Sequence, residues 1–290
     1  MTDFRTLRGP ALRTRFAPSL TGPLHLGHVC SALAGWSRAR STGGRFLLRL
    51  EDIDQGRCRP EYARATMDDL AWVGLDWDGP VRVQSAHLAQ YRRTLDALEA
   101  NDLLYPCFCT RADIAASGSA PHRAPDGTAV YPGTCRRIDP ALRAARVAAG
   151  EAHALRLDME RAVRVAGPLS RIELGQGDEV GRFACRPELF GDVVLARKEV
   201  PASYHLCVTH DDALQEVTLV TRGIDLLPST DLHRLLQALM DWPEPAYAHH
   251  RLLHDEAGRR LAKRDGAASL ASLRAQGVSP AEIRTMAACR

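Results

Sequence analysis

The segment RFAPSLTGPLHLGH, residues 15–28, contains the features from which the fold of this chain can be predicted. A short strand candidate over 14–16 leads into a loop rich in proline and glycine, and a helical pattern follows over 24–40. His25 and His28 stand three residues apart at the start of this helix, a spacing that places both imidazoles on one face. The unpaired backbone amides of a helix N-terminus attract anions, so the segment predicts a phosphate-binding turn.

Gly27 lies between the two histidines and would let a flat nucleotide base approach the backbone closely. Two histidines at this spacing are, on their own, more often a surface helix cap than a binding site. A pair of metal ligands is a further alternative. The remainder of the sequence is needed to decide between these interpretations.

Strand and helix patterns alternate beyond this segment. Residues 45–50 (RFLLRL) have the pattern of a buried strand. Pro60 begins a helix that extends to about residue 73, where Gly74 ends it, and another helix is expected over 88–100. Strands that alternate with helices are typical of a parallel sheet with crossover helices, so the predicted fold class is α/β.

The pattern changes near residue 105, and the stretch 105–191 is expected to be an insertion or subdomain. A helix is expected over 231–240, capped by Ser229 or Thr230, and residues 279–282 fit a capping box. Core-like patterns return after the insertion at residues 192–196, 204–209 and 216–220.

The composition excludes several classes of protein. Of the 290 residues, 45% are hydrophobic and 25% are charged, values that are ordinary for a folded globular protein. No apolar run approaches the span of a bilayer, and the arginine-containing start has no apolar stretch of a secretory signal, so a cytoplasmic location is expected. The net charge of +3 is too small to indicate a partner.

Eight cysteines in a chain of this length favour free thiols or a metal over a disulfide scaffold. Cys107, Cys109 and Cys135 supply three thiols on an irregular segment, and tetrahedral zinc needs four ligands. Tyr131, His122 and Cys185 are the candidates for the fourth ligand, histidine being the ordinary choice on chemical grounds. Buried free thiols are the alternative to a metal site.

Four further blocks follow residues 15–28 in order: RFLLRLEDID at 45–54, DLAWVGLD at 69–76, TRGIDLLPST at 221–230 and HDEAGRRLAKR at 254–264. Together they resemble the glutamyl branch of the class I aminoacyl-tRNA synthetases, with residues 15–28 at the HIGH signature and 254–264 at the KMSKS loop. The resemblance implies a Rossmann-like catalytic domain with its active site at the carboxyl ends of the strands.

The resemblance also implies a reaction in which the carboxylate of L-glutamate attacks the α-phosphate of ATP, with Mg²⁺ accompanying the nucleotide. His25, Gly27 and His28 would contact ATP, and the two histidines would stabilise charge as pyrophosphate leaves. The implied glutamate contacts are Arg15, Ser19, Glu51, which would take the α-ammonium group, Tyr204 and Arg222. Taken alone, Glu51 could instead pair with Arg49 at the strand end, and Asp211 and Asp212 could form a solvated turn.

Residues 260–264 depart from the KMSKS pattern because both ends are arginine and Ala262 replaces the usual serine. Lys263 is retained, and only it and Lys198 are lysine among the 38 basic residues. It would place an ammonium group on the ATP phosphates and act in catalysis. An exposed basic hairpin is the alternative, and the missing hydroxyl puts the detailed phosphate contacts in doubt.

The resemblance also implies a set of metal ligands in the cysteine cluster. Short glutamyl enzymes of one branch bind zinc through two nearby cysteines, a tyrosine and a later cysteine. In this chain the resemblance implies a structural zinc ion held by Cys107, Cys109, Tyr131 and Cys135. The zinc-containing segment would lie where tRNA is contacted.

The chain ends shortly after Arg264, whereas full-length glutamyl-tRNA synthetases continue into anticodon-reading domains. The expected relative is the truncated branch, which activates glutamate without tRNA and transfers it to queuosine at the wobble position of tRNA(Asp). The alternatives are a truncated enzyme that charges tRNA(Glu) and a non-catalytic RNA-binding paralogue. No membrane and no obligate protein partner are expected.

The predicted organisation has four parts that follow the family pattern. They are the first half of the catalytic domain at 1–104, a zinc-containing, acceptor-binding insertion at 105–191, the second half of the catalytic domain at 192–245, and the lysine loop with a short helical segment at 246–290.

Overall fold

The parallel pairing expected of the first strands is present in the computed structural model, which describes residues 11–116, 123–175, 180–254 and 268–288. β1 (Arg13–Phe16) pairs in parallel with β2 (Arg45–Leu50), and β2 pairs in parallel with β3 (Arg82–Val83). Five of the six residues of β2 are buried, in keeping with its apolar sequence.

A second sheet continues from the first and has the strand order β7–β6–β10–β9. Its strands are β6 (Ser170–Leu174), β7 (Val180–Ala184), β9 (Leu219–Gly223) and β10 (Ala246–His250). β10 is parallel to both β6 and β9, and β7 is antiparallel to β6. Thr218 lies just before β9, and its amide donates to the carbonyl of Arg13 on β1 at 2.9 Å. This hydrogen bond links the second sheet to the first. The α/β fold class is therefore confirmed.

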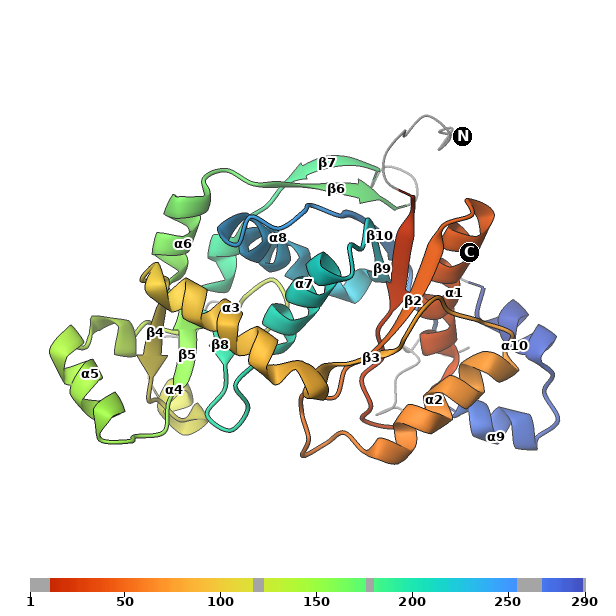
Figure 1. The fold of residues 1–290 in the computed structure, drawn as a ribbon, viewed down its shortest axis with the longest axis horizontal. Coiled ribbons are helices and arrows are strands. Elements are labelled where there is room, and N and C mark those ends of the chain that lie inside the picture. The colour runs from red at the N-terminus through yellow and green to blue at the C-terminus, as the bar shows by residue number, and fades with distance from the viewer. Residues whose placement is uncertain (1–10, 117–122, 176–179, 255–267, 289–290) are drawn as a thin grey trace.

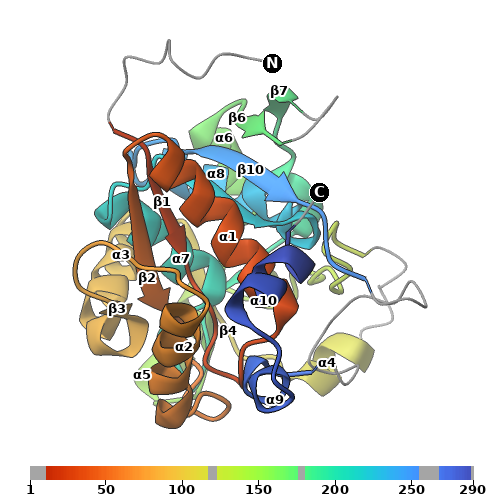
Figure 2. The same cartoon turned by 90° about the vertical axis from the view of Figure 1, so that its right-hand side faces the viewer.

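Helices cover this sheet and connect its strands (Figure 1). α1 (Leu26–Ser41) crosses the face formed by β1, β2 and β9, and α9 (Leu270–Ala275) and α10 (Pro280–Met286) pack beside it. Figure 2 shows α10 next to α1. The remaining helices are α2 (Pro60–Trp72), α3 (Leu88–Ala100), α4 (Arg111–Ala116), α5 (Pro140–Ala148), α6 (Met159–Ala166), α7 (Tyr204–Leu214) and α8 (Ser229–Leu239). Short 3₁₀ turns occupy Gln84–His87, Cys135–Arg137, Pro187–Phe190 and Ile224–Leu226.

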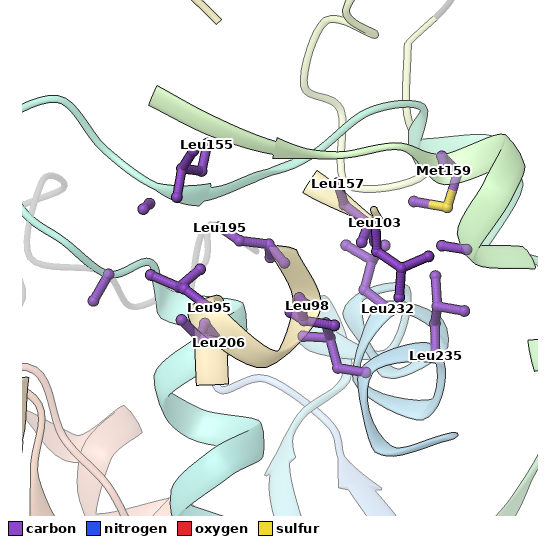
Figure 3. Packing of buried hydrophobic residues seen from close by; sticks show 14 of the residues in the cluster. Leu95, Leu98, Leu103, Leu155, Leu157, Met159, Leu195, Leu206, Leu232 and Leu235 are labelled. Carbon is purple, nitrogen blue, oxygen red and sulfur yellow. The ribbon is translucent and has the colours of Figure 1, made fainter. Parts of the chain in front are cut away.

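A third, antiparallel sheet has the order β4–β5–β8, formed by Leu104–Cys107, Ala154–Leu157 and Val194–Ala196. Its apolar side chains share one core with α3, α7 and α8. Figure 3 shows this packing, in which Leu95 and Leu98 of α3 meet Leu155 and Leu157 of β5, Leu195 of β8, Leu206 of α7, and Leu232 and Leu235 of α8.

Strand pairing crosses two of the boundaries predicted from sequence. β6 and β7 lie within 105–191 but belong to the sheet that contains β9 and β10. β8 lies in 192–245 but pairs with β5 of the insertion. The predicted division of the chain into domains stays a prediction, and β5 of the stretch 105–191 shares one apolar core with α7 and α8 of the stretch 192–245.

Two predicted helix caps need correction. α1 begins at Leu26 rather than at residue 24, and His25 is its N-cap. α8 begins at Ser229 with Pro228 at the N-cap position and no side-chain cap, so neither Ser229 nor Thr230 caps it. The predicted capping box at 279–282 is present at the start of α10. No helix among the described residues is long and apolar enough to cross a membrane.

Candidate active site

The loop before α1 is held against the end of β2 by backbone hydrogen bonds. The Glu51 amide donates to the Pro18 carbonyl at 3.0 Å, and the Leu20 amide donates to the Glu51 carbonyl at 3.3 Å. Ser19 and Glu51 form an isolated parallel bridge. These contacts bring the carboxyl ends of β1 and β2 to the N-terminus of α1.

The two histidines cap α1 reciprocally. The Gly27 amide donates to Nδ1 of His25 at 3.1 Å, and the His25 amide donates to Nδ1 of His28 at 3.1 Å. Because both Nδ1 atoms accept hydrogen bonds, a neutral ring carries its proton on Nε2. The ring centroids lie 3.8 Å apart, so two Nε2–H donors stand side by side at a helix N-terminus. This arrangement suits an anion such as phosphate.

A cavity of about 680 Å³ opens at this position. It is bordered by the loop before α1, the end of β2, the start of α7 and the end of β9. The predicted glutamate and ATP residues that the structure describes all line it: Arg15, Ser19, His25, Gly27, His28, Glu51, Tyr204 and Arg222. Lys263 lies outside the described residues, as does the loop around it.

Beneath one wall of the cavity lies a buried network of charges. Arg49 is fully buried and donates to Asp212 at 2.8 Å, and one of its nitrogens lies 3.5 Å from Glu51. Arg15 donates to both carboxylate oxygens of Asp212, at 2.9 and 3.2 Å. Asp211 accepts from the Arg82 guanidinium at 2.8 Å. Asp211 and Asp212 are thus buried on α7, and the alternative of a solvated turn is wrong.

The acidic pair on α7 was not assigned a role from the sequence. The signal that could have found it is Arg49, a charged residue that stands between the leucines of the strand RFLLRL. A guanidinium at such a position requires a buried carboxylate partner. Which carboxylate it meets depends on how α7 packs against the sheet.

Glu51 has an unusual protonation equilibrium for a glutamate. Burial raises the pKa of its carboxyl to about 7, although the charges of Arg49 and Arg15 act in the opposite direction. Its carboxylate is therefore only partly ionised near neutral pH. A cationic ligand such as an ammonium group would favour the ionised form.

Arg222 lies at the end of β9 on the opposite wall. Its guanidinium donates to His249 Nε2 at 3.1 Å, to His233 Nδ1 at 3.1 Å and to the Thr230 hydroxyl at 2.6 Å. Neither of these histidines was singled out from the sequence. They lie on β10 and α8, so only the tertiary structure brings them to Arg222.

The predicted metal ligands also lie close together. The sulfur atoms of Cys107, Cys109 and Cys135 all lie within 4.8 Å of one another. The Tyr131 hydroxyl lies 3.4 Å from the sulfurs of both Cys107 and Cys109, and accepts a hydrogen bond from the Cys135 amide at 2.9 Å. Tetrahedral ligands at about 2.3 Å from a zinc ion are somewhat less than 4 Å apart. The cluster could therefore hold a metal ion.

The other two candidates for a fourth ligand are His122 and Cys185. His122 lies outside the described residues. Cys185 is not among the metal-ligating groups gathered there in the described part of the chain. Burial and the nearby carboxylate of Asp231 raise the pKa of its thiol to about 12, which disfavours the thiolate that a metal requires.

Comparison with known proteins agrees with this geometry. Residues 11–290 match the family described as tRNA synthetases class I (E and Q), catalytic domain, and the chain belongs to this family of ligases. Among its relatives, a glutamyl-Q tRNA(Asp) synthetase of Rhodobacter capsulatus is 47% identical over 284 residues, covering 94% of this chain and 98% of that protein. A glutamyl-Q tRNA(Asp) synthetase of Symbiobacterium thermophilum is 44% identical, covering 93% of this chain and 83% of that protein.

A solved structure shares the fold. The crystal structure of a glutamate tRNA ligase from Elizabethkingia meningosepticum, in complex with its amino acid, superposes with a TM-score of 0.73 at 29% identity. The match covers 88% of this chain and 52% of that one, so this chain spans about half of that ligase's length.

Proposed function

We propose that this protein activates L-glutamate with ATP to form glutamyl-adenylate without tRNA, and then transfers the glutamyl group to queuosine at the wobble position of tRNA(Asp). The observation that carries the proposal is the single cavity that joins Glu51, Arg222 and the paired histidines. A carboxylate and a guanidinium suit the ammonium and carboxylate groups of an amino acid, and the histidines suit a phosphate. The names of the two relatives support the choice of acceptor.

In the first step, an oxygen of the glutamate α-carboxylate attacks the α-phosphorus of ATP. The bond from that phosphorus to the bridging oxygen breaks, and pyrophosphate leaves. His25 and His28 donate to the phosphate oxygens through Nε2–H, and Lys263 supplies a further positive charge. Glu51 holds the α-ammonium group, and Mg²⁺ accompanies the nucleotide.

In the second step, a hydroxyl oxygen of the cyclopentene-diol of queuosine attacks the acyl carbon of glutamyl-adenylate. An ester bond forms, the hydroxyl proton is released, and AMP leaves. Arg15, Ser19, Tyr204 and Arg222 keep the glutamyl group in place during both steps.

The first test is glutamate-dependent exchange of labelled pyrophosphate into ATP with no tRNA present. We expect exchange with glutamate and little with glutamine or aspartate. Exchange that requires tRNA(Glu) would favour a truncated glutamyl-tRNA synthetase. Absence of exchange under both conditions, from folded protein, would favour a non-catalytic RNA-binding paralogue.

The second test identifies the acceptor. Labelled glutamate should be transferred to tRNA(Asp) that carries queuosine, and the label should be released by mild base as expected for an ester. The matched control is tRNA(Asp) with guanosine at the same position, which lacks the diol. Transfer to tRNA(Glu) in place of tRNA(Asp) would contradict the proposed acceptor.

We further propose that Cys107, Cys109, Tyr131 and Cys135 hold one structural zinc ion. Three sulfurs and a phenol oxygen are suitable donors, and the hydrogen bonds of the cluster would be replaced by bonds to the ion. Lys198, one of the two lysines, donates to the Phe108 carbonyl at 2.9 Å and so ties the loop before α7 to the cluster. The ion would therefore order both the insertion and the approach to Tyr204.

Removal of one sulfur tests the zinc proposal. Cys109→Ser should lose bound zinc and lower the unfolding temperature, because a structural zinc ion contributes directly to folding. Metal content by mass spectrometry and thermal unfolding check this prediction. Tyr131→Phe tests whether the phenol oxygen of Tyr131 is the fourth zinc ligand. Cys207→Ser is the control, because Cys207 is a buried thiol outside the cluster. One equivalent of zinc in Cys109→Ser would show that the ligands are misassigned.

A further inference from the structure

Arg222 differs from the other arginine of the cavity in what surrounds its charge. Arg15 forms an ion pair with Asp212 through two charge-assisted hydrogen bonds. Arg222 is 5% exposed, and within the described part of the chain it forms no ion pair with a carboxylate. Its three hydrogen-bond partners are two imidazoles and a hydroxyl group.

The tautomer of His249 is set by a buried carboxylate. Nδ1–H of His249 donates to Glu173 at 2.7 Å, and the His249 amide donates to the other oxygen of Glu173 at 2.9 Å. The proton is thereby held on Nδ1, which leaves Nε2 to accept from Arg222. Burial lowers the pKa of His249, although Glu173 acts in the opposite direction, and this favours the neutral ring.

His233 is held in the complementary tautomer. Its Nδ1 accepts from Arg222, so its proton lies on Nε2, which faces Nδ1 of His205 at 3.2 Å. Burial and the positive charge of Arg222 lower the pKa of His233 well below its usual value. Both imidazoles therefore orient the guanidinium without adding or cancelling charge.

A buried cation that lacks a carboxylate partner is energetically unfavourable until an anion binds to it. A neutral ligand of the same shape would leave that charge uncompensated. The environment of Arg222 thus favours a ligand with a carboxylate over one with an amide at the same position.

We infer that Glu173, His249 and His233 are positioning residues that hold Arg222 in the correct orientation for a carboxylate of the amino-acid substrate. Through Arg222 they determine the preference for glutamate over glutamine. This inference rests on the proposed function, because it assigns the specificity of the same cavity.

Glu173→Gln tests the inference. A glutamine has one acceptor oxygen where Glu173 uses two, so it cannot keep both contacts with His249 as they stand, and either the His249 tautomer or its position must change. We expect KM for glutamate to rise about tenfold or more, and the preference for glutamate over glutamine to fall by a similar factor. KM for ATP should stay within about threefold of the wild type, and so should kcat.

Two comparisons separate positioning from general destabilisation. Glu244→Gln makes the same chemical change at a partly exposed carboxylate that pairs with the buried Arg234 just before β10, and should leave the kinetics unchanged. His233→Asn keeps an acceptor near the position of Nδ1 and should retain most of the preference for glutamate, whereas His233→Leu removes the acceptor and should lose it. Thermal unfolding of each variant shows that it is folded.

Wild-type KM and preference in folded Glu173→Gln and His233→Leu would overturn the inference. So would equal rises in KM for glutamate and ATP, which indicate a structural effect. Absence of glutamate-dependent exchange in the wild type would instead overturn the proposed function, and the inference with it.

Discussion

Glu51 illustrates how burial makes the charge of one residue depend on pH. Its pKa rises from 4.5 to about 7 because the carboxyl is removed from water. Between these values the native state binds a proton that the unfolded state has released. The group therefore lowers the free energy of unfolding as pH rises through this window, and full ionisation is reached only above it.

The predicted consequence concerns glutamate binding. As pH falls from about 8 to about 6, kcat/KM for glutamate should fall with an apparent pKa near 7, because protonated Glu51 cannot attract an ammonium group. Pyrophosphate exchange measured across this range checks the prediction. Glu51→Gln should remove this titration and keep a high KM, and a flat profile in the wild type would contradict the assignment.

His25 caps α1 through Nδ1, and the proposed function gives its other ring nitrogen a chemical role. In His25→Asn, the side-chain oxygen can replace Nδ1 as the acceptor from the Gly27 amide, while the Nε2–H donor is lost. We expect stability close to the wild type with a strongly reduced rate of pyrophosphate exchange.

The matched variant His25→Ala removes both roles. It should reduce exchange similarly and also lower the free energy of unfolding by about 1 kcal/mol, the usual effect of losing a helix cap. Urea unfolding of the two variants checks this difference. Equal stability in both would show that the cap does not contribute.

At the scale of elements, α1 carries the histidines and is placed by a close approach to the sheet. A Cβ on Gly35 would lie 2.8 Å from the Thr221 hydroxyl and 3.2 Å from the Phe46 ring. The Gly35 carbonyl also accepts a hydrogen bond from Thr14 at 3.0 Å. The absence of a side chain thus lets α1 lie directly on β1, β2 and β9.

Gly35→Ala should therefore destabilise the protein by about 1–3 kcal/mol, because overpacking outweighs the better helix propensity of alanine. Thermal or urea unfolding measures this effect. Gly56→Ala is the control, since its new Cβ would make only an ordinary contact of 3.6 Å with Asp54. A stabilised Gly35→Ala protein would show that the helix can shift without strain.

At the scale of the whole molecule, Asp212 joins segments that are far apart in the chain. It accepts from Arg15 on β1 and from Arg49 on β2, while it belongs to α7 beyond the insertion. Arg15, Glu51 and Tyr204, which line the cavity, lie on or directly beside these same segments. The geometry of the cavity is therefore coupled to the packing of the two halves of the catalytic domain.

Asp212→Asn should lower the free energy of unfolding by about 3–5 kcal/mol, because two buried guanidinium groups lose their shared charge partner. Chemical denaturation checks this value. The control Asp96→Asn breaks an exposed ion pair with Arg92 and should change stability by less than about 1 kcal/mol. A small effect of Asp212→Asn would show that Glu51 or Asp211 compensates.

Local sequence patterns predicted the elements in which the buried positions are mostly apolar and the exposed positions mostly polar. The strand at 45–50 and the helix at 88–100 have the predicted bounds because their apolar periodicity is strong. Asp212 was misjudged because adjacent acids are usually exposed, and only packing of α7 against Arg49 buries them. Thr230 was expected as a cap, but it instead accepts a hydrogen bond from Arg222.

The sequence by itself determined the class of fold, the turn at His25 and His28 where α1 begins, and the residue types of the cavity. These properties depend on neighbours within one helix or strand, and such neighbours are visible in the order of residues. The tertiary structure alone decided that His233, His249 and Glu173 surround Arg222, and that burial raises the pKa of Glu51. Partners far apart in sequence meet only when sheets and helices pack, and both desolvation and hydrogen-bond geometry arise from that packing.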